Sequence, residues 1–254
     1  MSTLLKRMGN KSKLAPKIIS HFPKHDFFVD AFCGALGIFM HKTLAKYNVI
    51  NDNDADVYNL YCQLMRNKEE LYHQLEIMPI SQDLFNFWRD GNRESCDLLN
   101  AVRFVFLSNY SFFGGADSLR LDASNTKKIL LAAVEKTFLK LYGVQVINKD
   151  FRQVIPSIQF KNPKNAFVYF DPPYINTGDN YASSFKEQDS LDLFEIMANC
   201  GIKCAMSEFS NPFILEQANK NGFRVIEIGE RQTLKSRNTE ILVLNYDDNQ
   251  LKLF

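Results

Sequence analysis

The tetrapeptide Asp171-Pro172-Pro173-Tyr174 has the residue types of a reactive site and directly follows the apolar segment Phe167–Phe170. Ligands of open α/β sheets bind beyond the carboxyl ends of the strands. Proline fixes φ and biases the preceding residue toward extended backbone, so the Asp171 carboxylate and the Pro172 carbonyl would be two rigid hydrogen-bond acceptors. Such a pair suits a flat conjugated amine, such as that of a nucleobase, whose lone pair must be localised as an electrophile approaches. Tyr174 would stack on the base; the alternative is that the prolines form only a stiff turn.

A second turn has the features of a cofactor site. The segment from Phe28 to Gly37 places Asp30 at the end of an expected strand, with Phe32 and Gly34 in the turn before an expected helix. Glycine in such a turn lets the backbone approach a ligand closely. The turn lacks both the GxGxxG pattern and the Gly-Lys pattern of a P-loop, so neither a dinucleotide nor a nucleoside triphosphate is indicated. The alternative is a tight connection between a strand and a helix.

A third candidate is Asn51-Asp52, at the end of the next expected strand. A carboxylate in this place can accept hydrogen bonds from both hydroxyls of a ribose. The alternative is a helix cap, which Asn53 or Asp54 could form in either case.

The elements that would position these residues alternate between strands and helices, which indicates an open, mostly parallel α/β sheet. Asp189 or Ser190 could cap a helix over Leu191–Asn199, and Asn211-Pro212 could begin another that ends before Gly222. Only a polar loop separates the last two expected strands, which suggests an antiparallel hairpin at one sheet edge. The expected strands are Phe27–Ala31, Tyr47–Asn51, Val144–Ile147, Phe167–Phe170, Lys203–Ser207, Arg224–Ile228 and Glu240–Tyr246.

A helical lobe is expected between the second and third strands. Strand patterns vanish from about Ala55 to Leu141, and apolar residues recur at helical spacing. We therefore assign residues 55–144 to an inserted lobe and residues 1–54 and 145–254 to the domain that contains the sheet. The lobe also contains a polar and aromatic stretch from Asn109 to Arg120.

Composition narrows the class of protein without naming it. The 254 residues are 46% hydrophobic, which is enough for one large domain or a domain with an inserted lobe. The five cysteines show no CxxC pairing, which favours reduced thiols in the cytoplasm. No segment approaches the length of a membrane span. The net charge is only +1, so any binding to nucleic acid must come from a local basic face.

The ordered set of motifs resembles the Dam-like N6-adenine DNA methyltransferases, especially the branch encoded by phages. Gly9-Asn10-Lys11, Phe32-Cys33-Gly34, Asn51-Asp52, a helical lobe and the Asp171 tetrapeptide occur in the family's order along nearly the whole chain. The resemblance implies a Rossmann-like methyltransferase sheet with a C-terminal antiparallel hairpin and a helical target-recognition lobe. It also implies methyl transfer from S-adenosylmethionine to N6 of an adenine that is flipped out of duplex DNA, with GATC the family's commonest target.

The resemblance further implies where the cofactor would bind. Lys11 would meet its carboxylate end, Asp52 its ribose, and Asp171 the methyl group at the transfer site. Asp150-Phe151 resembles an element beside the cofactor's adenine. Two residues depart from the family pattern: Arg7 stands where an aromatic near the cofactor is usual, and Leu36 where many members have a second glycine. No metal is required, because a sulfonium is already an activated electrophile.

Candidate DNA contacts come from the lobe and from the end of the chain. Asn109 and Arg120 could read base edges, although aromatic neighbours in this stretch could equally be lobe core. Other candidates are placed where relatives approach the target strand: Tyr181, Phe185, Lys235, Arg237 and Asn238. Lys235 and Arg237 fit phosphate contacts, but a charged hairpin tip is commonly just solvated.

Several alternatives stay open at the level of sequence. A methyltransferase of RNA adenine or of a protein glutamine amide would also act on a flat conjugated amine. A catalytically silent DNA-binding regulator would keep the fold, although the intact Asp171 tetrapeptide argues against it. We expect a monomer that could dimerise on DNA; the sequence does not reveal a recognition site or whether there is a cognate restriction endonuclease.

Overall fold

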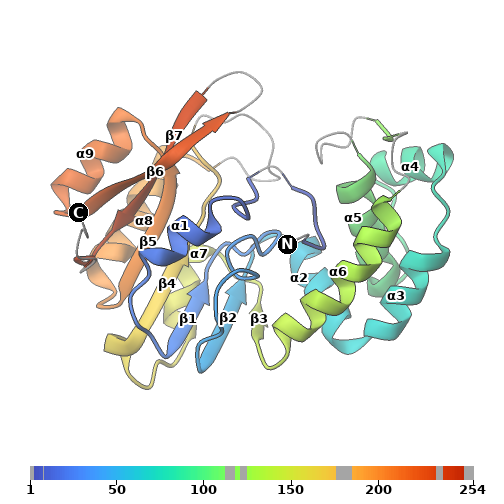
Figure 1. The fold of residues 1–254 in the computed structure, drawn as a ribbon, viewed down its shortest axis with the longest axis horizontal. Coiled ribbons are helices and arrows are strands. Elements are labelled where there is room, and N and C mark those ends of the chain that lie inside the picture. The colour runs from blue at the N-terminus through green and yellow to red at the C-terminus, as the bar shows by residue number, and fades with distance from the viewer. Residues whose placement is uncertain are drawn as a thin grey trace.

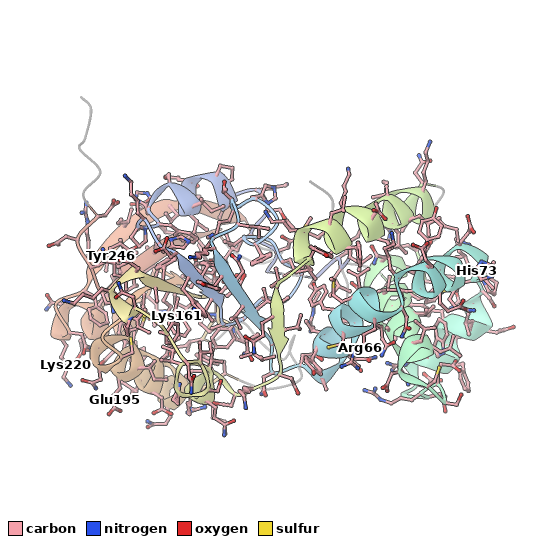
Figure 2. All side chains as sticks on the ribbon, turned by 90° about the horizontal axis from the view of Figure 1, so that it is seen from below. Arg66, His73, Lys161, Glu195, Lys220 and Tyr246 are labelled. Atoms are coloured by element: carbon pink, nitrogen blue, oxygen red, sulfur yellow. The ribbon has the colours of Figure 1, made fainter. Side chains whose placement is uncertain are left out.

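The computed structural model describes residues 3–7, 9–111, 118–120, 125–175, 185–232 and 237–248. Figure 1 shows a twisted sheet with helices packed on it and, to one side, a separate group of helices. In Figure 2, Arg66 and His73 lie in this helical group, whereas Glu195, Lys220 and Tyr246 lie at the opposite end of the molecule. No helix in the described part of the chain is long and apolar enough to cross a membrane.

The sheet has seven strands in the order β3-β2-β1-β4-β5-β7-β6. Strands β1 to β5 are parallel, and β7 pairs antiparallel with both β5 and β6. All the expected strands and the terminal hairpin are confirmed, and the fold is Rossmann-like. The strands are β1 Phe27–Asp30, β2 Tyr47–Asn51, β3 Gln145–Ile147, β4 Ala166–Phe170, β5 Lys203–Phe209, β6 Arg224–Gln232 and β7 Arg237–Leu244.

The strand order fixes where a ligand can bind. β1 pairs with β2 on one side and with β4 on the other. The chain runs from β1 outward to β2 and β3, and then crosses back to β4 on the other side of β1. This is the topological switch point at which open α/β sheets bind ligands. Successive side chains of these strands point to opposite faces of the sheet: Phe28 and Tyr169 pack in one hydrophobic cluster, and Val29 and Val168 in the other.

In the described part of the chain, four helices and two 3-10 turns accompany the sheet. The helices are α1 Ala15–Ser20, α7 Phe151–Val154, α8 Glu187–Asn199 and α9 Pro212–Lys220; the turns are Ile155–Ser157 and Pro163–Asn165. Helices α7, α8 and α9 contribute to the same cluster as Val29, and α1 to the one that contains Phe28. Both faces of the sheet are therefore covered, as a parallel sheet requires.

Two expectations about helices need correction. Helix α8 begins at Glu187, earlier than expected, because Asp189 is its third residue and accepts the backbone N–H of Lys186 at 2.7 Å. After β1 there is no helix but a series of turns, because Gly34 and Leu36 adopt left-handed φ values of 44° and 61° that interrupt helical backbone. Helix α9 begins as expected, with Asn211 capping Ile214 N–H at 3.0 Å.

Among the described residues between β2 and β3 there are five helices: α2 Ala55–Arg66, α3 Lys68–Ile77, α4 Gln82–Arg89, α5 Asp97–Tyr110 and α6 Thr126–Leu141. Asp54 caps α2 by accepting Asp56 N–H at 2.9 Å. Leu60, Leu71 and Phe106 are fully buried between these helices, in a cluster that continues into the face of the sheet containing Phe28. We call this group of helices the helical lobe.

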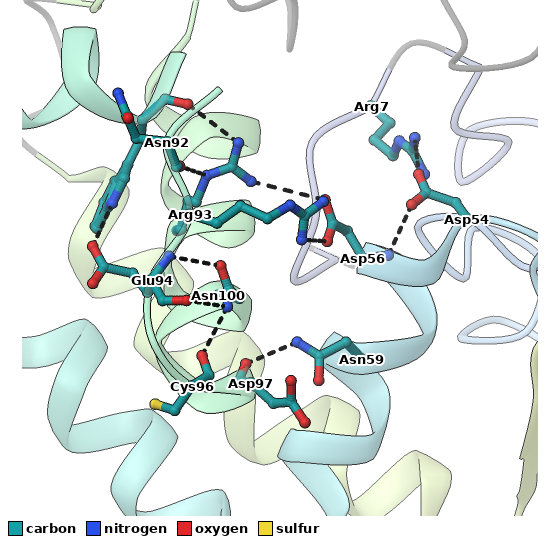
Figure 3. A network of polar contacts seen from close by, with 12 residues as sticks. Arg7, Asp54, Asp56, Asn59, Asn92, Arg93, Glu94, Cys96, Asp97 and Asn100 are labelled. Carbon is teal, nitrogen blue, oxygen red and sulfur yellow. Dashed lines mark hydrogen bonds and ion pairs between the residues drawn. The ribbon is translucent and has the colours of Figure 1, made fainter. Parts of the chain in front are cut away.

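Polar contacts gather around the start of α2 (Figure 3). Arg7 pairs with Asp54 at 2.8 Å, and Arg93, which precedes α5, pairs with Asp56 at 2.8 Å. The N-terminal segment also runs along α5, because the Ser108 hydroxyl accepts the Lys6 N–H and donates to the Lys6 carbonyl, each at 2.9 Å. The N-terminal segment thus contacts both the sheet and the lobe.

Candidate active site

A cavity of about 790 Å³ lies at the carboxyl ends of β1, β2 and β4. Its walls come from the N-terminal loop, the turn after β1, the end of β2, the start of α7, the segment after β4 and the start of α8. The cavity therefore brings together residues that the sequence places far apart. The expected site residues that line it are Arg7, Lys11, Phe32, Gly34, Asp52, Asp150, Phe151, Asp171, Pro173 and Phe185.

Asp52 organises the turn after β1. One oxygen of its carboxylate accepts Gly34 N–H at 2.8 Å and the other accepts Asp54 N–H at 2.9 Å. Burial raises the pKa of Asp52, and these two backbone N–H groups oppose the rise. Each carboxylate oxygen keeps a second lone pair, so Asp52 can still accept hydroxyl groups of a ligand.

Asp30 sits behind this turn and does not line the cavity. Its side chain is buried, and its Oδ1 atom has no hydrogen-bond partner among the described residues. Burial, and then the charges of Asp171 and Asp52, hold the pKa of Asp30 well above its usual range. A cationic ligand group near these carboxylates would relieve their repulsion.

One wall of the cavity is aromatic. The ring of Phe151 lies 5.6 Å from Phe32 and 5.8 Å from Phe185, and Phe32 lies 6.2 Å from Phe185. Arg152 fixes this wall by pairing with Asp150 of α7 at 3.2 Å and with Asp189 of α8. The wall offers flat apolar surfaces suited to a planar heteroaromatic ring.

Asp171 also lines the cavity and comes immediately after β4. Pro172 is buried and Pro173 lines the cavity, so the two prolines fix the backbone beside Asp171. The Asp171 side chain is 20% exposed and its Oδ1 is 3.3 Å from the Lys11 ammonium. This leaves Asp171 accessible to a ligand.

Lys11 lies at the centre of a buried polar cluster. Its ammonium donates to the Tyr174 hydroxyl, pairs with Glu240 at 2.9 Å, and lies 4.2 Å from the centroid of the Tyr174 ring. The Tyr174 hydroxyl donates to Glu240, and the Tyr174 ring packs edge-on against Phe209 at 4.5 Å. In this structure Lys11 therefore faces the Asp171 side of the cavity.

Among the residues expected to contact DNA, Asn109 is placed inside the protein. Its side chain is 3% exposed, and its amide donates to the carbonyls of Leu4 and Val105. A buried amide whose hydrogens are bonded to the backbone cannot reach a base. Its polarity serves instead to fasten the N-terminal segment to α5.

The other expected DNA contacts are placed differently. Arg120 is partly exposed and follows a bridge between Ser111 and Leu119, and Asn238 is partly exposed on β7. Phe185 lies in the aromatic wall with Phe32. Tyr181, Lys235 and the side chain of Arg237 lie outside the described residues.

Three charged residues near the cavity were not anticipated from sequence: Arg152, Glu208 and Glu240. Burial raises the pKa of Glu208 to about 8, and the charges of Glu240 and Asp171 act in the same direction. For the two glutamates, the signal in the sequence is a charged residue beside apolar strand residues, such as Glu240 before Ile241–Leu244. A buried charge in such a strand indicates a partner.

The cavity fits S-adenosylmethionine in the chemistry of its walls. The aromatic wall suits an adenine ring, Asp52 has lone pairs for ribose hydroxyls, and the Asp171 carboxylate lines the same cavity.

Comparison with known proteins agrees with this chemistry. The Type II methyltransferase M1.LlaDCHI of Lactococcus lactis subsp. cremoris is 26% identical over 94% of this chain and 93% of its own length. The Retron Ec67 DNA adenine methylase of Escherichia coli is 25% identical over 78% of this chain and 72% of its own length. The DNA adenine methylase of Salmonella typhi is 25% identical over 77% and 75%.

A family model describes the chain over most of its length. The model named "D12 class N6 adenine-specific DNA methyltransferase" matches residues 8–234, a range that includes the helical lobe and the cavity-lining residues apart from Arg7. The chain therefore belongs to the D12 class of N6 adenine-specific DNA methyltransferases.

Proposed function

We propose that the protein uses S-adenosylmethionine as methyl donor and that the cavity beside Asp171 is the site of transfer to adenine N6. When bound, the cofactor would supply an activated methyl group on its sulfonium. The observation that carries the proposal is that one cavity joins an aromatic wall, the Asp52 carboxylate and the proline-fixed Asp171 carboxylate.

The roles of the cavity residues follow from their chemistry. Phe32 and Phe151 would hold the cofactor's adenine, with Phe185 completing the same wall and not contacting DNA. Asp52 would accept the ribose hydroxyls, and Asp30 would lie behind the turn that holds this part of the molecule. Lys11 would still attract the cofactor's carboxylate, although its contacts place it nearer to Asp171.

Asp171 and the Pro172 carbonyl would accept the two hydrogens of the target amine. These two hydrogen bonds would localise the nitrogen lone pair and direct it toward the methyl group. The acceptors must be held in place beforehand, because conjugation of the lone pair with the adenine ring makes the amine a poor nucleophile. Tyr174 would support the flipped base by stacking. The chain's contribution is thus orientation and charge, which requires Asp171 to be accessible, as its 20% exposure allows.

Recognition of duplex DNA is proposed for the helical lobe, residues 55–144, and for the β6–β7 hairpin. Figure 1 shows the lobe and the hairpin extending on either side of the N-terminal segment. Arg120 and Asn238 are partly exposed on these two parts. GATC is the first target sequence to test. Two relatives are named modification methylases, so a cognate restriction endonuclease is the second partner to test for.

The test is transfer of tritium from methyl-labelled S-adenosylmethionine into duplex DNA, with N6-methyladenine identified after digestion. The wild-type protein should label DNA, and Asp171→Ala should abolish labelling while duplex binding persists, since phosphate contacts are untouched. Asp247→Ala, an exposed carboxylate beyond β7, is the matched control. Retention of one tenth of wild-type turnover by Asp171→Ala would refute the assignment of Asp171.

A further inference from the structure

Glu240 is a charged side chain in a place where charge is costly. It lies on β7 next to the buried residues Ile241 and Leu242, and its side chain is 0% exposed. A buried carboxylate is tolerated only when it is paired and hydrogen-bonded, and a pair of this kind commonly adds less to stability than to specificity of structure. The question is therefore what Glu240 holds in place.

Glu240 contacts two residues that also contact Asp171, namely Lys11 and Tyr174. Its Oε1 atom is 2.9 Å from the Lys11 ammonium and accepts a hydrogen bond from the Tyr174 hydroxyl. Lys11 and Tyr174 also contact Asp171 Oδ1, each at 3.3 Å. Glu240 and Asp171 thus share the same two neighbours, and the ammonium is closer to Glu240.

This sharing matters because Asp171 must keep acceptor capacity for the target amine. A lysine with no other counter-charge would be drawn fully onto Asp171, where it would neutralise the carboxylate and occupy a lone pair. With Glu240 as its nearer partner at 2.9 Å, Lys11 divides its ammonium charge between Glu240 and Asp171, whose Oδ1 atom is 3.3 Å away.

Glu208 does not take over this task. It lies on β5, where Phe209 N–H donates to its Oε1 at 2.8 Å and its Oε2 has no partner among the described residues. Because burial raises its pKa to about 8, Glu208 is mainly protonated at neutral pH. The charge that balances Lys11 therefore comes from Glu240 and Asp171.

We propose that Glu240 is a positioning residue for methyl transfer: it anchors the Lys11 ammonium and the Tyr174 hydroxyl so that the Asp171 carboxylate stays oriented and available to the adenine amine. This inference rests on the proposed function, which places transfer at Asp171. Glu240 touches neither substrate nor cofactor in this scheme and acts through its two neighbours.

The test is steady-state kinetics of Glu240→Gln, which removes the charge and keeps an acceptor for Tyr174. We expect kcat to fall about 10- to 100-fold, as for a small misplacement of a reacting group, with KM for DNA and for S-adenosylmethionine changed less than about threefold. Glu227→Gln, an exposed glutamate on the neighbouring strand β6, is the control and should match the wild type. A wild-type kcat in Glu240→Gln would overturn the proposal.

A double-mutant cycle separates this role from a general loss of structure. If Glu240 acts by restraining Lys11, then Glu240→Gln should add no further loss of kcat to a Lys11→Gln protein. Two losses that multiply would overturn the proposal. If thermal unfolding shows that Glu240→Gln does not fold, Glu240→Asp is tested in its place, because aspartate keeps the charge but withdraws it from Lys11. A lowered kcat with unchanged KM in Glu240→Asp supports the proposal, and a wild-type kcat overturns it.

The outcomes also separate this inference from the proposed function. If the wild type transfers no methyl group to adenine, or if Asp171→Ala remains active, the proposed function fails first. If the wild type is active, Asp171→Ala is inactive and Glu240→Gln has normal kcat, only the role of Glu240 fails.

Discussion

Gly37 permits a close approach on which the position of Lys11 depends. A Cβ atom added to Gly37 would lie 2.5 Å from Asn10 Oδ1 and 2.8 Å from the Lys11 backbone nitrogen. Neither neighbour can yield without cost: the Asn10 oxygen accepts hydrogen bonds from the Ser12 N–H and hydroxyl, and the Lys11 carbonyl accepts the first hydrogen bonds of α1. Gly37→Ala should therefore push the whole Gly-Asn-Lys loop away from the turn after β1.

The structure sets the size of this displacement. Restoring an ordinary contact of 3.4 Å requires the Lys11 nitrogen to move by about 0.6 Å and the Asn10 oxygen by about 0.9 Å. Overpacking of this kind costs about 1–3 kcal/mol of stability. A misplacement approaching 1 Å at a reacting centre lowers turnover by up to about 100-fold. We expect Gly37→Ala to melt several degrees lower than the wild type and to lose about 10- to 100-fold in kcat.

The assays are thermal unfolding and labelled methyl transfer at saturating DNA and cofactor. Gly201→Ala is the matched control, because Gly201 has φ +68° with open space around its missing Cβ and lies far from the cavity. It should lose about 1 kcal/mol of stability with normal kcat. If Gly37→Ala kept both wild-type stability and wild-type kcat, the reasoning about this contact would be refuted.

Three further changes test other parts of the site. Asp52→Asn removes one of two acceptors and should weaken S-adenosylmethionine binding by about 1.5–3 kcal/mol in calorimetry, with duplex binding unchanged. Glu208→Gln should be more stable than the wild type at pH 8 and lose this advantage toward pH 5. In the native wild type the Glu208 carboxyl has a pKa of about 8, whereas in the unfolded chain it loses its proton near the ordinary pKa of a glutamate. The stability of the wild type therefore falls as the pH rises between these two pKa values. Arg120→Ala should cost about 1–3 kcal/mol at the preferred site and relax preference at one base position; equal weakening on matched and mismatched duplexes would show a phosphate contact instead.

The sheet could be predicted from sequence because its information is local. Each strand is a short run of β-branched and aromatic residues, and residues that end strands fall at one edge once the strands are parallel. That is why Asp52 and Asp171 are found in one cavity although 119 positions separate them in sequence. Caps such as Asn211 on α9 are equally local.

Contacts made over long distances in the chain escaped prediction. Asn109 is polar and belongs to a stretch rich in polar residues, but the N-terminal segment covers it and uses its amide. The sequence around Glu240 predicts a strand and a charged residue that needs a partner, but nothing in it reveals that this partner is Lys11. The turns after β1 replace an expected helix because Leu36 adopts a left-handed φ that its residue type does not favour.

The N-terminal segment physically couples the cavity to the helical lobe. Arg7 lines the cavity and pairs with Asp54 at 2.8 Å, and its guanidinium also lies 5.6 Å from the centroid of the Phe104 ring on α5. Four residues further on, Lys11 contacts Asp171. Movement of α5 relative to the end of β2 must therefore strain contacts of Arg7 at the rim of the cavity. Because coupling free energies between binding sites are reciprocal, a ligand that orders this rim should favour one position of the lobe, and DNA that fixes the lobe should in turn favour the same arrangement of the rim.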